Sequence, residues 1–334
     1  MAQAESERLT EIVMSAALSR AVCSVAELGV ADEIEPEAAK PVSEIASATK
    51  THERSLYRVL RFLASHGIFQ ERENRQFAHT PLSRSLRSDA EGSFRAGARM
   101  IHRLFPAFDG LHHTALTGEP AFKKVFGKPL FDYVGSHPEL PAIFDAGMSS
   151  FHGHETPAML KAYDFSAIKV LADVGGGNGS LIAAVLKHYP QLRGILFDLG
   201  HVIGRARQNL QSAGTGDRCT IVEGNFFESV PSGADAYLFR HIIHDWTDEQ
   251  CVQILSNCRK VIPSDGRLLV VEAVVPMGNE PSMAKGFDMA MLTFPGGFER
   301  TEAEYKALFE QAGFRISGVT PTRSAVSLVE GRPK

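Results

Sequence analysis

Apolar residues near the start of the chain recur at helical spacing. Leu9, Ile12, Val13 and Ala16 follow the i, i+3, i+4, i+7 spacing of one helix face, and the apolar series continues until Gly29. A helix with such a stripe buries it against a partner surface. We therefore expect the chain to open with helices, and we expect their apolar faces to build an obligate homodimer because no other partner surface is evident.

A three-part pattern follows these helices. Residues 42–46 begin a short helix, and Thr51 is placed to cap a second helix that ends at residues 66–67. Apolar pairs at 68–69 and 77–78 flank a polar turn, which is typical of a small hairpin. Two helices followed by a two-stranded hairpin predict a winged helix.

In the rest of the chain, the pattern of apolar and polar residues changes twice. Residues 93–160 have a helical pattern dense in phenylalanine, which is typical of a core and equally of a binding pocket. After residue 164, short apolar runs alternate with helical segments, and they fall at 170–174, 194–197, 219–222, 236–239 and 267–271. Such runs predict a parallel sheet covered on both faces, with runs 314–319 and 324–329 as a closing hairpin.

These patterns predict an α/β protein with three parts. Residues 1–92 form a mostly helical winged-helix domain, residues 93–160 a helical connector, and residues 161–334 a Rossmann-like, doubly wound domain.

Composition narrows the possible functions. The 334 residues carry a formal net charge of -4, which gives no overall basic field to attract nucleic acid. The four cysteines are scattered without metal-ligand spacing, so we expect neither a zinc site nor a disulfide framework. The first ten residues lack the basic and apolar pattern of a signal peptide, and no stretch of about 18 apolar residues occurs. We expect a cytoplasmic protein that binds neither membrane nor nucleic acid.

A glycine-rich loop follows the first strand of the sheet. Asp173 precedes Gly175 and Gly177, and the helix begins near Leu181. Asp198 ends the next strand, where nucleotide-binding folds place a carboxylate for ribose hydroxyls. Both a dinucleotide and S-adenosylmethionine fit such a loop, and a glycine turn that binds nothing is the simplest alternative. Asp173 favours S-adenosylmethionine, because a carboxylate suits its cationic end and repels a pyrophosphate.

Polar and aromatic side chains follow the next two strands. Asn225 and Phe226 either bind and stack an adenine or form an ordinary strand-end turn. Residues 240–246 carry two histidines, and His244 has a pKa suited to removing a hydroxyl proton. Glu272 and Glu299 are candidates to orient the imidazole, and surface acids are the alternative for both.

With these motifs in place, the sequence resembles the small-molecule O-methyltransferases that depend on S-adenosylmethionine and act on caffeic acid, acetylserotonin and bacterial polyketides. The resemblance rests on residues 173–179, 197–199, 244–249, 296–301 and 312–314. It implies methylation of a hydroxyl on a small, apolar, aromatic secondary metabolite.

The resemblance also assigns roles to single residues. His244 would be the general base flanked by Glu272 and Glu299, and Gly175, Asp198 and Arg240 would contact the cofactor. Acceptor-pocket positions would be Phe144, Met148, Phe151, Asp245, Asp288, Met291 and Phe294. The winged helix would join the chain to an intertwined second copy. The family usually has Asp where this chain has Asn225, and its plant members have Asn where Phe294 stands, which implies a less polar acceptor site.

Three other functions fit parts of the pattern. Some relatives keep the fold and cofactor but hydroxylate, methylate carbon or catalyse other reactions. A nicotinamide-dependent oxidoreductase is disfavoured by Asp173 and by Ser180, which stands where the dinucleotide motif G-x-G-x-x-G/A has Gly or Ala. A transcriptional regulator would need a basic recognition helix, and the arginines of residues 51–66 fit the polar face of an ordinary helix.

Overall fold

The computed structural model describes residues 2–334, which form two compact units. One unit runs to residue 109 and includes residues 131–153, and the other comprises residues 110–130 and 154–334. The segment expected as a separate connector, residues 93–160, is therefore divided between the two units.

The first unit contains the winged helix. Its elements are α1 (Ala2–Leu28), η1 (Val30–Glu33), β1 (Ala39–Pro41), α2 (Val42–Ala48), α3 (Glu53–Ser65), β2 (Phe69–Arg72), η2 (Glu73–Arg75), β3 (Gln76–His79), α4 (Pro81–Arg84), α5 (Arg95–Leu104), η3 (Phe105–Gly110), α8 (Leu130–Gly135) and α9 (Leu140–His152). Three details differ from the sequence prediction. The opening segment is one long helix, His52 rather than Thr51 is the N-cap of α3, and β1 adds a third strand beside β3. Strand β1 has only three residues, too few to give an alternating pattern.

Helix α1 belongs to the core only at its C-terminal end. Val25 and Ala26 are buried there against α3 and the hairpin. Nearer the N-terminus, Leu9, Ile12 and Val13 are 63%, 53% and 71% exposed. By length and composition alone, residues 3–28 of this helix would also suffice to cross a membrane. An apolar face left uncovered in a single chain is typical of a contact with another surface.

The second unit is built on a seven-stranded sheet. Its elements are α6 (Leu111–Thr117), α7 (Ala121–Phe126), α10 (Glu155–Ala162), β4 (Val170–Val174), α11 (Ser180–His188), β5 (Arg193–Asp198), η4 (Ile203–Arg205), α12 (Ala206–Ser212), η5 (Gly216–Arg218), β6 (Cys219–Glu223), β7 (Ala236–Arg240), η6 (Ile243–Asp245), α13 (Asp248–Val261), β8 (Arg267–Glu272), α14 (Met283–Thr293), α15 (Glu302–Gln311), β9 (Phe314–Pro321) and β10 (Ser327–Pro333). The predicted strands and the closing hairpin are confirmed.

The order of the strands locates the binding edge of the sheet. The order is β6-β5-β4-β7-β8-β10-β9; the first five strands are parallel, and β10 runs antiparallel to both of its neighbours, β8 and β9. The chain moves outward from β4 through β5 to β6 and then returns to start the other half at β7. In such sheets, ligands bind beyond the carboxyl ends of the strands where the order reverses, which here is between β4 and β7.

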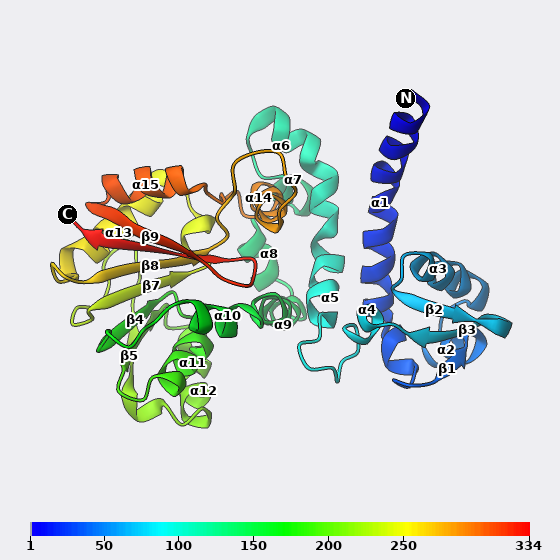
Figure 1. Ribbon diagram of the computed structural model, residues 1–334, viewed down its shortest axis with the longest axis horizontal. Coiled ribbons are helices and arrows are strands. Elements are labelled where there is room, and N and C mark those ends of the chain that lie inside the picture. The colour runs from blue at the N-terminus through cyan, green and yellow to red at the C-terminus, as the bar shows by residue number, and fades with distance from the viewer. Residues whose placement is uncertain (1) are drawn as a thin grey trace. The chain divides into compact units, whose positions relative to one another are not determined.

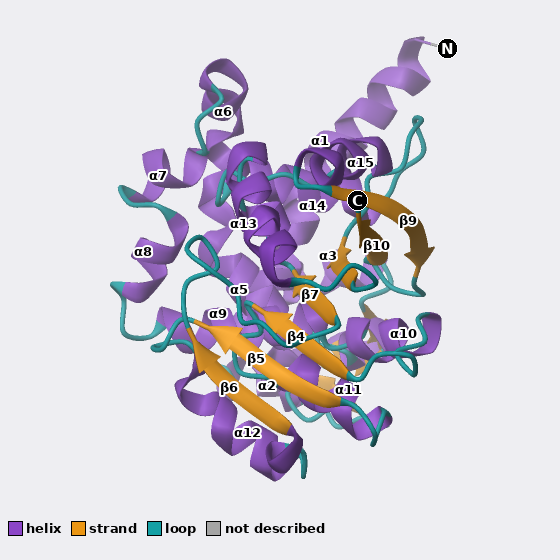
Figure 2. Ribbon diagram, turned by 90° about the vertical axis from the view of Figure 1, so that its left-hand side faces the viewer, coloured by secondary structure: helices purple, strands orange, loops and turns teal. Residues whose placement is uncertain are grey.

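Helices cover both faces of this sheet (Figures 1 and 2). On one face, side chains of α13 and α15 pack with β4, β7 and β8 in one buried cluster. On the other face, α11 and α12 pack with alternate residues of the same strands in a second cluster. Because both faces are filled, the loops at the carboxyl ends of the strands remain as the place for chemistry.

Candidate active site

The glycine loop after β4 is open on one side. Gly175 and Gly177 have φ angles of +73° and +60°, a region in which L side chains are strained. A Cβ atom on Gly175 would lie 2.4 Å from Ile242 Cδ1, whereas a Cβ on Gly177 would meet no heavy atom of residues 2–334 within 4 Å. Space for a ligand therefore adjoins Gly177.

Asp198 at the end of β5 reaches back to this loop. Its Oδ2 accepts a hydrogen bond from the Gly177 amide at 2.8 Å, and its Oδ1 accepts one from the Leu199 amide at 2.7 Å. A carboxylate has about four lone-pair positions, so both oxygens keep room for hydroxyl donors. The structure thus brings together the acid and the loop that the sequence paired.

Asp173 supplies the observation that bears most on the cofactor. The residue is 2% exposed, and among the described residues its Oδ2 has no hydrogen-bond partner. Burial raises the pKa of Asp173 to about 6, against the lowering effect of Arg240 and with a smaller raising effect of Asp198. A buried carboxylate oxygen without a donor fits the ammonium group of an amino-acid moiety, which S-adenosylmethionine carries.

The neighbouring candidates lie on the same edge of the sheet. Arg240 at the end of β7 donates from Nη1 to Thr156 Oγ1 at 2.9 Å. Asn225 Oδ1 accepts the Phe227 amide at 3.0 Å and so closes its own strand-end turn. The Phe226 ring meets Trp246 edge-on with centroids 6.1 Å apart. The adenine contacts expected of Asn225 and Phe226 stay predictions.

His244 lies in η6, within the segment 241–246 that we call the histidine loop. Its side chain is 8% exposed, its Nδ1 is 2.8 Å from Glu299 Oε1, and its Nε2 is 3.6 Å from Asp245 Oδ1. Burial alone lowers the pKa of His244, but the hydrogen bond to Glu299 and the charges of nearby carboxylates more than offset this and raise it to about 10. The imidazole is thus oriented by Glu299 through Nδ1, and its Nε2 lies on the side of Asp245.

Glu272, at the end of β8, acts differently from the sequence expectation. The sequence predicts that both flanking carboxylates orient the imidazole, and the structure shows that contact for Glu299. Glu272 Oε1 instead accepts backbone N–H bonds from the histidine loop, and its charge raises the pKa of His244 through space. The direct contacts of Glu272 are therefore with the backbone that carries His244.

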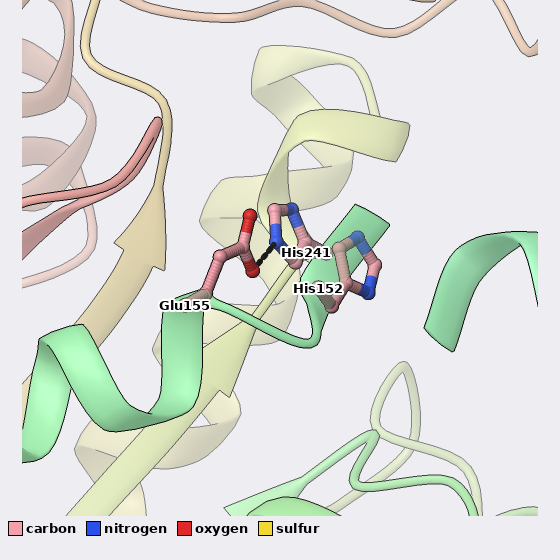
Figure 3. Close-up of side chains that lie close together, drawn as sticks. All are labelled: His152, Glu155 and His241. Atoms are coloured by element: carbon pink, nitrogen blue, oxygen red, sulfur yellow. Dashed lines mark hydrogen bonds and ion pairs between the residues drawn. The ribbon is translucent and has the colours of Figure 1, made fainter. Parts of the chain in front are cut away.

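The second histidine of the loop is in a different electrostatic state. Figure 3 shows the His241 ring turned toward Glu155, with Nε2 and Oε2 2.8 Å apart. Burial, together with the nearby His244 and Arg240, holds the pKa of His241 well below its ordinary value. Its ring centroid lies 5.2 Å from that of His244. The loop thus holds one imidazole whose pKa is raised and one whose pKa is lowered.

Some acceptor-pocket candidates lie in the second unit and the others in the first. In the second unit, Asp288 on α14 accepts the Glu299 amide at 3.0 Å, which ties that helix to the carboxylate beside His244. Phe294 ends the same helix and meets Phe122 edge-on at 6.2 Å, while Met291 is half-buried. The three candidates of the first unit, Phe144, Met148 and Phe151, all lie on α9 and are half-buried.

Two residues at this site were not singled out from the sequence. Arg300 is 2% exposed and donates to backbone carbonyls of the histidine loop, and the fully buried Tyr305 donates to Glu272. Arg300 belongs to the motif 296–301, so its position directly after Glu299 was the signal that the sequence offered. For Tyr305 the sequence offers none, because its apolar neighbours fit an ordinary helix face.

Comparison with known proteins agrees with this geometry. A family profile described as an O-methyltransferase domain matches residues 108–315, and one described as an O-methyltransferase dimerisation domain matches residues 10–89. A phenazine O-methyltransferase from Lysobacter antibioticus is 40% identical over 326 residues, which cover 97% of this chain and 95% of that protein.

Solved structures extend the comparison to ligands. A methyltransferase of calicheamicin biosynthesis, solved in its S-adenosylhomocysteine-bound form, is 37% identical and superposes with a TM-score of 0.89, covering 99% of both chains. An O-methyltransferase from neocarzinostatin biosynthesis was solved with S-adenosylmethionine and 2-hydroxy-5-methyl naphthoic acid. It is 34% identical, covers 95% of this chain and 96% of its own, and has a TM-score of 0.83.

Proposed function

Because this chain belongs to the S-adenosylmethionine-dependent O-methyltransferases that carry a dimerisation domain, we propose that it methylates a phenolic hydroxyl of a small aromatic secondary metabolite, with His244 as general base. The observation that carries the proposal is the buried contact between His244 Nδ1 and Glu299 Oε1 at 2.8 Å. In the neutral imidazole, which predominates above the pKa of about 10, this contact leaves Nε2 as the proton acceptor at the binding edge of the sheet.

The cofactor would be held by the groups around the glycine loop. Asp198 would bind the ribose hydroxyls, Asp173 the ammonium group, and Gly177 would admit the ligand against the main chain. The bound cofactor supplies an electrophilic methyl group on a positively charged sulfur. Arg240, beside Asp173, would balance the two acids of the site.

The histidine loop would handle the proton of the acceptor. A phenol has a pKa near 10, so its neutral oxygen is a poor nucleophile at pH 7 and gains from a base that takes its proton. Glu299 would hold the Nδ1 proton and stabilise the imidazolium that forms. Asp245 lies beside Nε2, where its carboxyl group would receive a donor of the acceptor. Holding acceptor and methyl donor in attack geometry would supply the larger share of the rate, up to about 7–11 kcal/mol.

The rest of the chain supports an aromatic acceptor and a homodimer. Phe122 and Phe294 form an aromatic pair in the second unit, and relatives named for a phenazine and a naphthoic acid act on or bind aromatic rings. The exposed apolar face of α1 lies within the dimerisation profile and would be covered by a second copy. We place the homodimer in the cytoplasm.

The test is methyl transfer to a panel of phenols, followed by mass spectrometry with isotopically labelled S-adenosylmethionine. We expect a single labelled methyl on oxygen in at least one phenol. We also expect His244→Ala to lower kcat by about 10²–10⁴-fold while leaving cofactor affinity unchanged. His188→Ala, an exposed histidine of the same unit, serves as the control. Full turnover in the His244 variant would refute the base assignment, and a label on carbon would refute O-methylation.

A further inference from the structure

The backbone N–H groups of the histidine loop converge on one atom. Glu272 Oε1 accepts hydrogen bonds from the amides of Ile242, Ile243 and His244 at 3.1, 2.7 and 3.2 Å. Three successive N–H groups pointing at one oxygen form a concave anion site made of backbone. A fully buried carboxylate therefore fixes the direction of the chain immediately before and at the base.

The carbonyl groups of the same loop are held by a cation. Arg300 donates from Nη1 to the Ile243 carbonyl at 3.0 Å and from Nη2 to the Trp246 carbonyl at 2.9 Å. Its Nε and Nη2 also bind Asp248 Oδ1 at 3.0 and 2.7 Å, which aligns the planar guanidinium. Ile243, the residue before the base, is thus bound to Glu272 through its N–H and to Arg300 through its carbonyl.

Tyr305 completes the arrangement by fixing the carboxylate itself. Its hydroxyl donates to Glu272 Oε2 at 2.5 Å, so each carboxylate oxygen has a separate task. Burial and the adjacent carboxylates hold the pKa of Tyr305 well above its ordinary value, which keeps the hydroxyl a donor at physiological pH. Thr301 caps α15 between Arg300 and Tyr305, so the start of one helix sets both positions.

The loop needs such anchors because its own hydrogen bonds are few. Within it, the Asp245 amide donates to the Ile242 carbonyl at 3.2 Å and the Trp246 amide to the Ile243 carbonyl at 3.3 Å. His241, at its start, has a φ of +53°, a conformation that non-glycine residues rarely adopt. A strained turn with two long hydrogen bonds keeps its shape only when its surroundings hold it.

We propose that Arg300 and Tyr305 are positioning residues for the methyl-transfer reaction: Tyr305 through the Glu272 carboxylate, and Arg300 directly, lock the histidine loop so that His244 Nε2 faces the acceptor oxygen. The inference rests on the proposed function insofar as His244 is the base. A displacement of about 1 Å in a catalytic group can cost about 10²-fold in rate. Loss of these hydrogen bonds to the histidine loop should therefore lower kcat rather than the affinity for the cofactor.

The first test compares two buried tyrosines of the same domain. Tyr305→Phe removes the bond to Glu272, whereas Tyr237→Phe removes a hydroxyl that donates at 2.7 Å to the Pro231 carbonyl, at the opposite end of β7 from the loop. Hydrogen exchange is measured on the S-adenosylhomocysteine-bound homodimer. We expect Tyr305→Phe to speed exchange of amides 242–244 about 10- to 100-fold, and Tyr237→Phe to leave them unchanged.

The second test separates geometry from folding. We expect Tyr305→Phe and Arg300→Lys to lower kcat at least tenfold toward the phenol selected from the panel, with an unchanged dissociation constant for S-adenosylhomocysteine. Arg300→Lys keeps the positive charge but lacks the planar guanidinium with its several N–H donors, so this variant should retain more activity than Arg300→Met. Unchanged exchange at amides 242–244 in Tyr305→Phe overturns the proposal, and so does faster exchange with full kcat. If His244→Ala itself keeps full turnover, the assignment of His244 as base is wrong, and the exchange result still decides whether Tyr305 holds the histidine loop in place.

Discussion

Replacing Glu299 by Gln removes one charge from beside His244, the proposed base, while keeping an oxygen that can accept the hydrogen bond from Nδ1. In the wild type, the imidazole and this carboxylate are 2.8 Å apart and both are buried. Two unit charges about 4 Å apart at an effective dielectric constant of about 20 interact by about 4 kcal/mol, which equals about three pH units in a pKa. Burial alone lowers the pKa of His244, so losing the carboxylate must move it downward from about 10.

The sign of the effect on activity follows from the role of the base. Only the neutral imidazole accepts a proton, so the rate rises with pH until the pH passes the pKa of His244. In Glu299→Gln, the acid limb of the kcat/KM profile should therefore move to lower pH by one to three units. The plateau rate should fall about tenfold, because a weaker base gains less from proton transfer and the imidazolium loses its stabilising charge.

The assay is methyl transfer measured from pH 6 to pH 10.5, together with NMR titration of ¹³C-labelled histidine in the S-adenosylhomocysteine-bound dimer. The NMR arm reports the pKa of His244 without any acceptor, whose own phenol ionises in the same range. Glu310→Gln serves as a control, because that exposed carboxylate lies near the C-terminal end of α15, away from its capped start. An acid limb that stays in place or moves to higher pH would refute the reasoning, as would an unshifted His244 resonance.

Two further predictions address the cofactor and the dimer. Asp198→Ala should lower the calorimetric affinity for S-adenosylmethionine and S-adenosylhomocysteine about 10- to 100-fold, since a hydrogen bond to a charged group is worth about 1.5–3 kcal/mol. Replacing the exposed Asp217 by Ala serves as the control, and an unchanged affinity in Asp198→Ala would refute the ribose assignment. Ile12→Glu combined with Val13→Glu should dissociate the homodimer in light scattering, because two charges enter the exposed apolar face of α1; an intact dimer would place the interface elsewhere.

Local patterns in the sequence determine much of this protein. The apolar runs predict the central strands β4, β7 and β8 because strands covered on both faces are continuous apolar segments in the sequence. The glycine loop and Asp198 are predictable as a pair, because a tight turn needs glycine and the fold brings adjacent strand ends together. The position of His244 near the glycine loop is also predictable, because His244 follows a strand that ends at the binding edge of the sheet.

Tertiary structure decides what each of these groups does. Nothing local distinguishes Glu299, which meets the imidazole, from Glu272, which holds the backbone, because each contact spans at least 28 positions in the sequence. The orphaned oxygen of Asp173 and the contrast between His241 and His244 come from burial and from charges on other elements. Arg300 and Tyr305 gain their roles only when α15 packs against the end of β8. Sequence thus sets which chemical groups are present and which elements carry them, whereas hydrogen-bond partners and pKa values depend on long-range packing.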